Sequence, residues 1–191
     1  MGRHASERSA AGSARARRAG PPPCPGPPAG ATGHSAGGTA VAQALHEDRR
    51  IAAAVNLEGH LDQMDGELLP VARQATDRPL LLAGTDGFRD ARLDRSWAAL
   101  LDHGGPVARQ QLDDTHHWVF TDYASLVPQL QQAGLMAAAG RASMTGRADP
   151  RVTVPAVRNL VRSFFARHLP RRAPLRPLSW HLGLRMAAVS R

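Results

Sequence analysis

The sequence of 191 residues predicts an α/β fold built on a parallel sheet. Two continuous apolar runs, residues 51–57 and 79–83, each end at polar and glycine residues, which is typical of strands buried on both faces of such a sheet. Residues 107–112 predict a third strand, and helix-forming residues occupy 39–47 and 96–101. Helices that alternate with short strands in this way indicate the α/β class.

Residues 153–169 form the strongest predicted helix. Valine and phenylalanine recur there at helical spacing while the arginines fall on other faces, so we expect the apolar side to pack on the sheet. The apolar positions are Val154, Val157, Val161, Phe164 and Phe165. Pro155 is expected in the first helical turn, where a missing backbone N–H is tolerated.

Composition divides the chain into a folded domain at 33–169 and two tails. The low-complexity Arg/Pro/Gly-rich residues 1–32 are expected to be disordered, and 170–191 form a basic tail. The net charge of +8 lies in these tails, since 33–169 hold fourteen arginines and fifteen acidic residues. Arginines scattered among small residues without stacking aromatics argue against specific nucleic-acid binding. With no apolar run long enough for a transmembrane segment and no signal peptide, a soluble, cytoplasmic protein is the default expectation.

The stretch Gly33-His34-Ser35-Ala36-Gly37-Gly38 fits the G-x-S-x-G turn that presents a nucleophilic serine in α/β-hydrolases. The helix expected at 39–47 would follow it directly, as the motif requires. The proline-rich residues 19–28 precede it, and proline cannot donate to a strand ladder. We therefore expect an incomplete α/β-hydrolase fold that contains the C-terminal strands and helices and lacks the strand before the serine.

The order of polar residues supports a serine hydrolase, because α/β-hydrolases place serine, acid and histidine in that order. Ser35 is followed by Glu58 and Asp86, each just after a predicted strand, and then by His116 and His117 after the third strand. Carboxyl ends of parallel strands gather at one edge, where such folds build their sites. From the spacing, either acid and either histidine fits.

Several motifs of the chain together resemble one family. They are Gly33-His34-Ser35-Ala36-Gly37-Gly38, Leu45-His46-Glu47-Asp48-Arg49-Arg50-Ile51, Val55-Asn56-Leu57-Glu58-Gly59, Pro79-Leu80-Leu81-Leu82 and Thr115-His116-His117-Trp118-Val119-Phe120-Thr121-Asp122-Tyr123. In order and spacing they resemble the C-terminal half of bacterial α/β-hydrolases related to platelet-activating factor acetylhydrolase, across residues 33–169.

The resemblance implies a role for each site residue. Ser35 corresponds to the nucleophile, Glu58 to the triad acid and His117 to the general base, while the amide of Ala36 would form part of the oxyanion hole. Glutamate replaces the usual aspartate of the family pattern, which changes the reach of the carboxylate. Asp86 is the alternative acid and His116 the alternative base.

We therefore expect a serine ester hydrolase, of the lipase, esterase or acetylhydrolase-like kind, that acts through an acyl-enzyme on a small-molecule or lipid-like ester. No cofactor is implied, and no metal, since the histidine spacing fits no zinc pattern. The second oxyanion donor would come from a loop before the serine turn, so the chain reads as a truncated fragment. A non-catalytic hydrolase remnant that serves as an interaction module is the alternative. The oligomeric state is left open.

Overall fold

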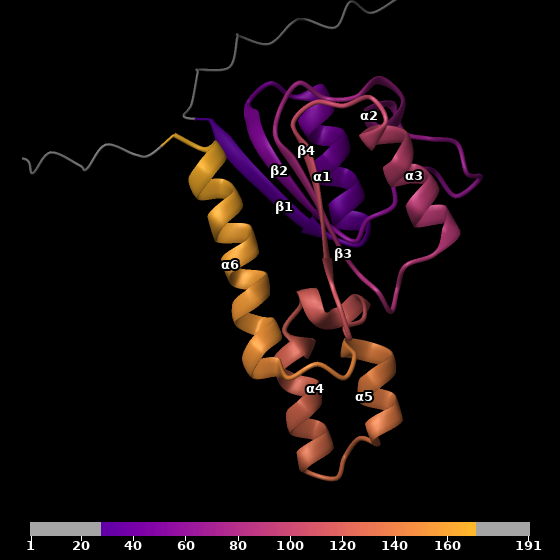
Figure 1. The fold of residues 1–191 in the computed structure, drawn as a ribbon, viewed down its shortest axis with the longest axis vertical. Coiled ribbons are helices and arrows are strands. Elements are labelled where there is room, and N and C mark those ends of the chain that lie inside the picture. Colours follow the sequence, from indigo (N-terminus) through magenta and orange to yellow (C-terminus); the bar gives the residue numbers. More distant parts are fainter. Residues whose placement is uncertain (1–27, 171–191) are drawn as a thin grey trace, which may run out of the picture.

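The computed structural model describes residues 28–170 and shows a four-stranded sheet with helices on both faces (Figure 1). The strands are all parallel and lie in the order β1-β2-β3-β4. Their bounds are Ala29–His34 for β1, Ile51–Leu57 for β2, Leu80–Thr85 for β3 and Val107–Leu112 for β4. The structure thus confirms the α/β class, with the three expected strands present as β2, β3 and β4.

Strand β1 corrects the expectation that no strand precedes the serine turn. It begins at Ala29, inside the segment expected to be disordered, and pairs along its length with β2. The sequence analysis missed β1 because its residues are small and show no apolar pattern. The apolar side chains that pack beside it belong to a distant part of the chain. A Cβ on Gly30 would lie 2.6 Å from the ring of Phe165. The remaining residues of the two predicted tails, 1–27 and 171–191, lie outside the described part of the chain.

One face of the sheet is covered by three helices, α1 (Ala36–Glu47), α2 (Pro70–Gln74) and α3 (Ala91–Leu101). Alternate strand residues point to this face, as the period of two of a strand requires. The fully or almost fully buried core there includes Ala42, Leu45, Leu61, Leu80, Leu82, Leu93, Trp97 and Leu100. Helices α1 and α3 match the helices expected at 39–47 and 96–101, and both begin earlier than expected.

The opposite face is covered by α6 (Pro150–His168), which lies along the sheet beside β1 (Figure 1). Leu160, Val161, Phe164 and Phe165 of this helix pack on Val55, Leu57, Leu81 and Ala83 of the strands. The expected packing of this helix on the sheet is therefore confirmed. The helix begins three residues earlier than expected, with the Asp149 side chain accepting the N–H of Arg151 as its N-cap. Pro155 consequently lies inside the helix and not in its first turn.

Between β4 and α6 the chain forms a small helical layer beyond the carboxyl ends of the strands (Figure 1). It comprises the 3-10 helix η1 (His117–Phe120), α4 (Tyr123–Gln132) and α5 (Ala138–Thr145). The sequence analysis did not predict these helices, because α4 contains an internal proline and α5 only one buried residue. Across residues 28–170, no helix has the length and apolar character needed to cross a membrane.

Candidate active site

The candidate site lies where the four parallel strands end at their carboxyl termini. Ser35 follows β1, Glu58 follows β2, Asp86 follows β3, and the loop after β4 leads to His117. Residues separated by more than eighty positions therefore come from one edge of one sheet. This is the place where open α/β sheets bind their ligands.

Ser35 occupies a strained turn between β1 and α1. Its backbone angles, φ 54° and ψ −125°, lie outside the regions that side chains usually permit, at a cost of about 1–3 kcal/mol. The turn is held by two backbone hydrogen bonds, from the Ser35 N–H to the Leu57 carbonyl (2.9 Å) and from the Thr39 N–H to the Ser35 carbonyl (3.1 Å). The Ser35 hydroxyl makes no capping bond to α1, although it stands at the N-cap position. The hydroxyl is therefore not used to cap α1.

Glycines permit this turn because three backbone segments approach closely. A Cβ on Gly33 would collide with the carbonyl of Gly37, and a Cβ on Gly59 would collide with the Ser35 carbonyl. A Cβ on Gly38 would collide with the Asn56 side chain, which is the close helix–strand approach expected from the motif. Any side chain here would force β1, α1 and the loop after β2 apart.

Glu58 is fully buried, and hydrogen bonds occupy both of its carboxylate oxygens. Oε1 accepts the backbone N–H of Thr85 (2.5 Å) and its hydroxyl (2.6 Å), and Oε2 lies 2.9 Å from Nδ1 of His117. A buried carboxylate needs such partners, since an unpaired buried charge is costly. The geometry directs one oxygen of Glu58 at the imidazole and anchors the other on β3.

The backbone around Glu58 is as tightly held as its side chain. Glu58 has a left-handed φ of 60°. The Asn56 side chain spans the turn: its Oδ1 accepts the N–H of Gly59 (2.6 Å), and its Nδ2 donates to the Gly59 carbonyl (2.9 Å). The indole N–H of Trp97 donates to the same carbonyl at 3.0 Å. These buried bonds fix the position from which the Glu58 side chain extends.

His117 is 7% exposed and lies between aromatic rings. Its imidazole stacks on Phe88, with 3.9 Å between ring centroids and 24° between planes, and the ring of His34 lies 4.3 Å away. A neutral imidazole that donates from Nδ1 to Glu58 leaves Nε2 as a hydrogen-bond acceptor. That is the protonation form a general base requires.

His34 connects the serine turn to the histidine loop. Its Nε2 lies 2.9 Å from the carbonyl oxygen of His117, which places the residue before Ser35 in contact with His117. Burial and the nearby His117 ring lower the pKa of His34 despite the opposing effects of that hydrogen bond and of Glu58. A neutral His34 that donates from Nε2 therefore holds the two loops together. Across residues 28–170, no hydrogen bond joins the Ser35 hydroxyl to an imidazole.

The structure gives the two alternative residues other partners. Nδ1 of His116 accepts the N–H of His117 at 2.9 Å and caps η1. Asp86 accepts the backbone N–H groups of Asp114 (3.0 Å) and Thr115 (3.1 Å). Among the described residues, neither the His116 ring nor the Asp86 carboxylate is hydrogen-bonded to the side chain of Glu58 or His117.

Ala36 is the first residue of α1, directly after the serine. Amide groups in the first turn of a helix have no partner within the helix, and they carry its positive dipole end. A negative charge beside this end of α1 would therefore be stabilised.

Sequence analysis missed Thr85 and Phe88, which touch Glu58 and His117, and it gave no separate role to His34 or Asn56. The available signal was weak: a threonine at the end of an apolar strand, followed by a turn. Within the described range, no group of three or more His, Cys, Asp or Glu side chains is placed to hold a metal ion.

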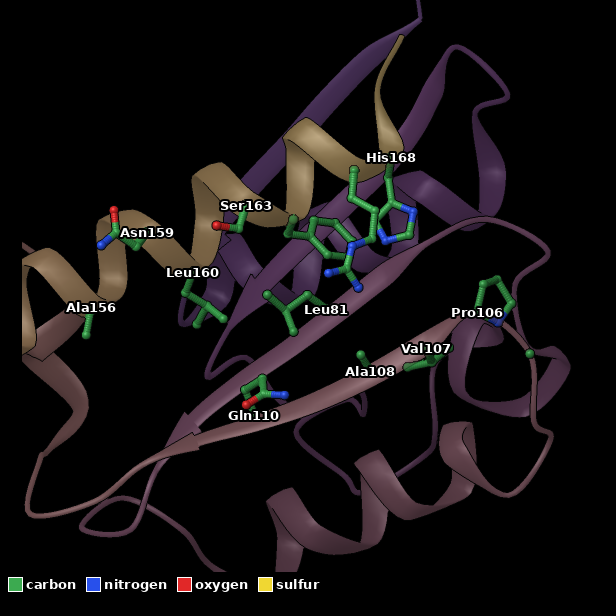
Figure 2. A pocket seen from close by; sticks show the side chains of 13 residues that line it. Leu81, Pro106, Val107, Ala108, Gln110, Ala156, Asn159, Leu160, Ser163 and His168 are labelled. Atoms are coloured by element: carbon green, nitrogen blue, oxygen red, sulfur yellow. The ribbon is translucent and has the colours of Figure 1, made fainter. Parts of the chain in front are cut away.

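A groove lies away from these residues, between α6 and strands β3 and β4 (Figure 2). It has a volume of about 690 Å³, and Leu81 and Leu160 face one another across it. None of Ser35, Glu58 and His117 lines this groove. The groove is therefore separate from the candidate active site.

Comparison with solved structures supports the fold. A ferulic acid esterase from Streptomyces cinnamoneus is similar over 80% of this chain and 44% of its own length, with 28% sequence identity and a TM-score of 0.58. An acylaminoacyl peptidase from Pyrococcus horikoshii matches 75% of this chain and 24% of its own, with 18% identity and a TM-score of 0.48. This chain thus spans less than half of the esterase. No family model and no curated protein sequence matches it.

The likeness to the esterase and the parallel sheet together show an α/β-hydrolase fold, of which residues 28–170 contain four parallel strands and their helices. The likeness to acetylhydrolases stays a prediction from the sequence motifs.

Proposed function

We propose that this chain, which has part of an α/β-hydrolase fold, carries the catalytic residues of a serine ester hydrolase. The observation that carries the proposal is the buried Glu58–His117 pair, 2.9 Å apart, at the sheet edge where the strained turn of Ser35 also lies. A carboxylate, an imidazole and a serine in that chain order are the components of the α/β-hydrolase triad. The similarity to a ferulic acid esterase supports ester substrates.

In the proposed mechanism, Nε2 of His117 accepts the hydroxyl proton of Ser35 while Oγ attacks the ester carbonyl carbon. The Glu58 carboxylate holds the imidazole through Nδ1 and stabilises the imidazolium that forms. The tetrahedral oxyanion lies near the amide of Ala36. The proton on His117 then passes to the leaving alcohol as the ester C–O bond breaks, and an acyl-enzyme remains on Ser35.

The second half of the cycle reverses these roles. Water donates a proton to Nε2 of His117 and attacks the acyl carbon, and the returning proton restores the Ser35 hydroxyl as the acid leaves. His34 limits the freedom of the His117 backbone during both steps through the 2.9 Å contact with its carbonyl.

The test is reaction with a fluorophosphonate probe, which phosphonylates activated serines. We expect wild-type protein to be labelled at Ser35, as mapped by mass spectrometry, and Ser35→Ala to lose the label. Ser125→Ala is the matched control, because Ser125 is an exposed serine on α4 outside the site. Folded, soluble wild-type protein that is never labelled at Ser35 would contradict the proposal.

The alternative function is a non-catalytic interaction module. It is favoured by strand β1, which pairs only with β2 among the described strands and so offers its other edge to a further strand. In that case the wild-type protein would stay unlabelled, and its hydrolysis of p-nitrophenyl esters would equal that of Ser35→Ala.

A further inference from the structure

The loop after β3 carries an acid that sequence reasoning ranked as an alternative triad member. Asp86 stands directly after the strand, yet its carboxylate is directed at the loop after β4. Oδ2 accepts the N–H of Asp114 at 3.0 Å, and Oδ1 accepts the N–H of Thr115 at 3.1 Å. Two backbone hydrogen bonds also join these loops: the Asp86 N–H donates to the Leu112 carbonyl (3.3 Å), and the Gly87 N–H donates to the Thr115 carbonyl (3.1 Å).

The segment that Asp86 holds is a tight turn that leads straight into the histidines. Asp114 has a left-handed φ of 55°, a conformation that aspartate adopts more readily than most residues. The turn is held from outside, since the N–H groups of Arg147 and Ala148 donate to the Asp114 carbonyl. The remaining donors of the turn, on Asp114 and Thr115, point at the Asp86 carboxylate.

The loop after β3 and the loop after β4 are closely packed against each other. A Cβ on Gly87 would lie 2.6 Å from the Thr115 carbonyl and 2.8 Å from the His116 ring. Thr85, the last residue of β3, donates its hydroxyl to Glu58, and the loop that follows it supplies the Phe88 ring that stacks on His117. A shift in the loop after β4 would therefore move His117 relative to both of its contacts.

We propose that Asp86 is a positioning residue: its carboxylate fixes the turn at Asp114–Thr115 and thereby sets the place where His117 meets Glu58. The significance for catalysis rests on the proposed function. Asp86 does not touch the reacting atoms. Burial raises the pKa of Asp86, but the backbone N–H donors lower it further than burial raises it, so the group is ionised at neutral pH. An ionised carboxylate accepts both amides at once, which an alanine cannot do and an asparagine does only in part.

The test compares Asp86→Ala and Asp86→Asn in the full chain with Asp149→Ala. Asp149 is the matched control because its carboxylate also accepts a backbone N–H, that of Arg151 at 2.8 Å, but it caps α6 outside the site. The first measurement is the downfield proton resonance of His117 Nδ1–H, which the Glu58 hydrogen bond produces. Circular dichroism establishes that each variant is folded.

We expect the resonance to be lost in Asp86→Ala, weakened in Asp86→Asn and unchanged in Asp149→Ala. The second measurement is the rate of fluorophosphonate labelling at Ser35. It should fall roughly 10- to 100-fold in Asp86→Ala, because misplacement of a catalytic group by about 1 Å costs on that order. Asp86→Asn should recover part of this rate.

The two measurements separate this inference from the proposed function. A wild-type protein that is never labelled, but whose resonance is lost in Asp86→Ala and kept in Asp149→Ala, leaves the positioning role intact and contradicts the esterase. A folded Asp86→Ala whose resonance equals that of the wild type overturns the positioning role. If Asp86→Ala does not fold, a folded Asp86→Asn with an unaltered resonance overturns it instead.

Discussion

Glu58 shows how one side chain connects three strands. It extends from the end of β2, accepts two hydrogen bonds from Thr85 on β3 and faces His117 in the loop after β4. The longer glutamate reaches both partners from a backbone that is held in a left-handed conformation. The length of the side chain, in addition to its charge, therefore allows Glu58 to contact both Thr85 and His117.

Glu58→Gln should reduce fluorophosphonate labelling at Ser35 on the order of 10⁴-fold, the scale of an acid-to-amide change in a serine protease triad. The amide keeps the volume of the side chain but cannot accept from both Thr85 and His117 with the same strength. Glu67→Gln is the control, since Glu67 is exposed and its carboxylate pairs with Arg73 (2.6 Å), away from the site. Single-turnover labelling measures both rates, and a Glu58→Gln rate within threefold of wild type would remove Glu58 from the mechanism.

Among the elements, α6 combines strong packing with a local defect. Its apolar side covers the β1–β3 face of the sheet, while Pro155 interrupts its hydrogen-bond ladder in the second turn. Proline has no N–H to donate to the carbonyl four residues earlier, that of Arg151. The position is exposed, so nothing in the core requires the proline ring.

Pro155→Ala should therefore stabilise the protein, by about 1–3 kcal/mol in the free energy of unfolding, given the helix-interior cost of proline. Pro150→Ala should bring no such gain, because Pro150 begins the helix, where no N–H partner exists in any case. Urea denaturation followed by circular dichroism measures both. Equal midpoints for wild type and Pro155→Ala would show that tertiary packing already offsets the defect.

At the scale of the whole molecule, the described part is a sheet covered by helices on both faces, with the site at one edge. Arginine side chains lower the pKa of several aspartates at its surface. Hydrogen bonds from Arg50 lower the pKa of Asp48 to about 2. Hydrogen bonds from Arg89 likewise lower the pKa of Asp94, and those from Arg151 lower that of Asp149. Each carboxylate binds fewer protons in the folded chain than in the unfolded chain.

The sign of the pH dependence follows from these directions. A carboxylate with a depressed folded pKa contributes stability above its unfolded pKa of about 3.9, and this stability is lost as the pH falls through the folded pKa. We expect the urea midpoint to decline between about pH 4 and pH 2. In Asp48→Asn, the urea midpoint should fall less over this pH range than in the wild type. A wild-type midpoint at pH 2 equal to that at pH 4 would contradict the predicted pH dependence. These side chains are partly exposed to solvent, and screening keeps the contribution of each one small.

Local sequence was sufficient for much of the fold. The apolar runs at 51–57 and 79–83 predicted buried strands, and the confirmed packing of α6 followed from the spacing of its valines and phenylalanines. Local pattern failed for β1, whose small residues leave room for Phe165 of a distant helix, and for α4, where Pro128 masks the helical pattern. Such partners are far away in the sequence, so no window of neighbouring residues contains the signal.

The order of Ser35, Glu58 and His117 along the chain is a property of the sequence, and so is the expectation of serine chemistry at the strand ends. The spacing of the residues left the pairing of acid and base open, although the family resemblance implied Glu58 and His117. Glu58 and Asp86 both follow strands, and only the folded chain directs Glu58 to His117 and Asp86 to the turn before it. The reason is geometric: the hydrogen-bond partner of a carboxylate depends on the position of backbone amides contributed by other loops, and those positions exist only once the strands have been assembled in register.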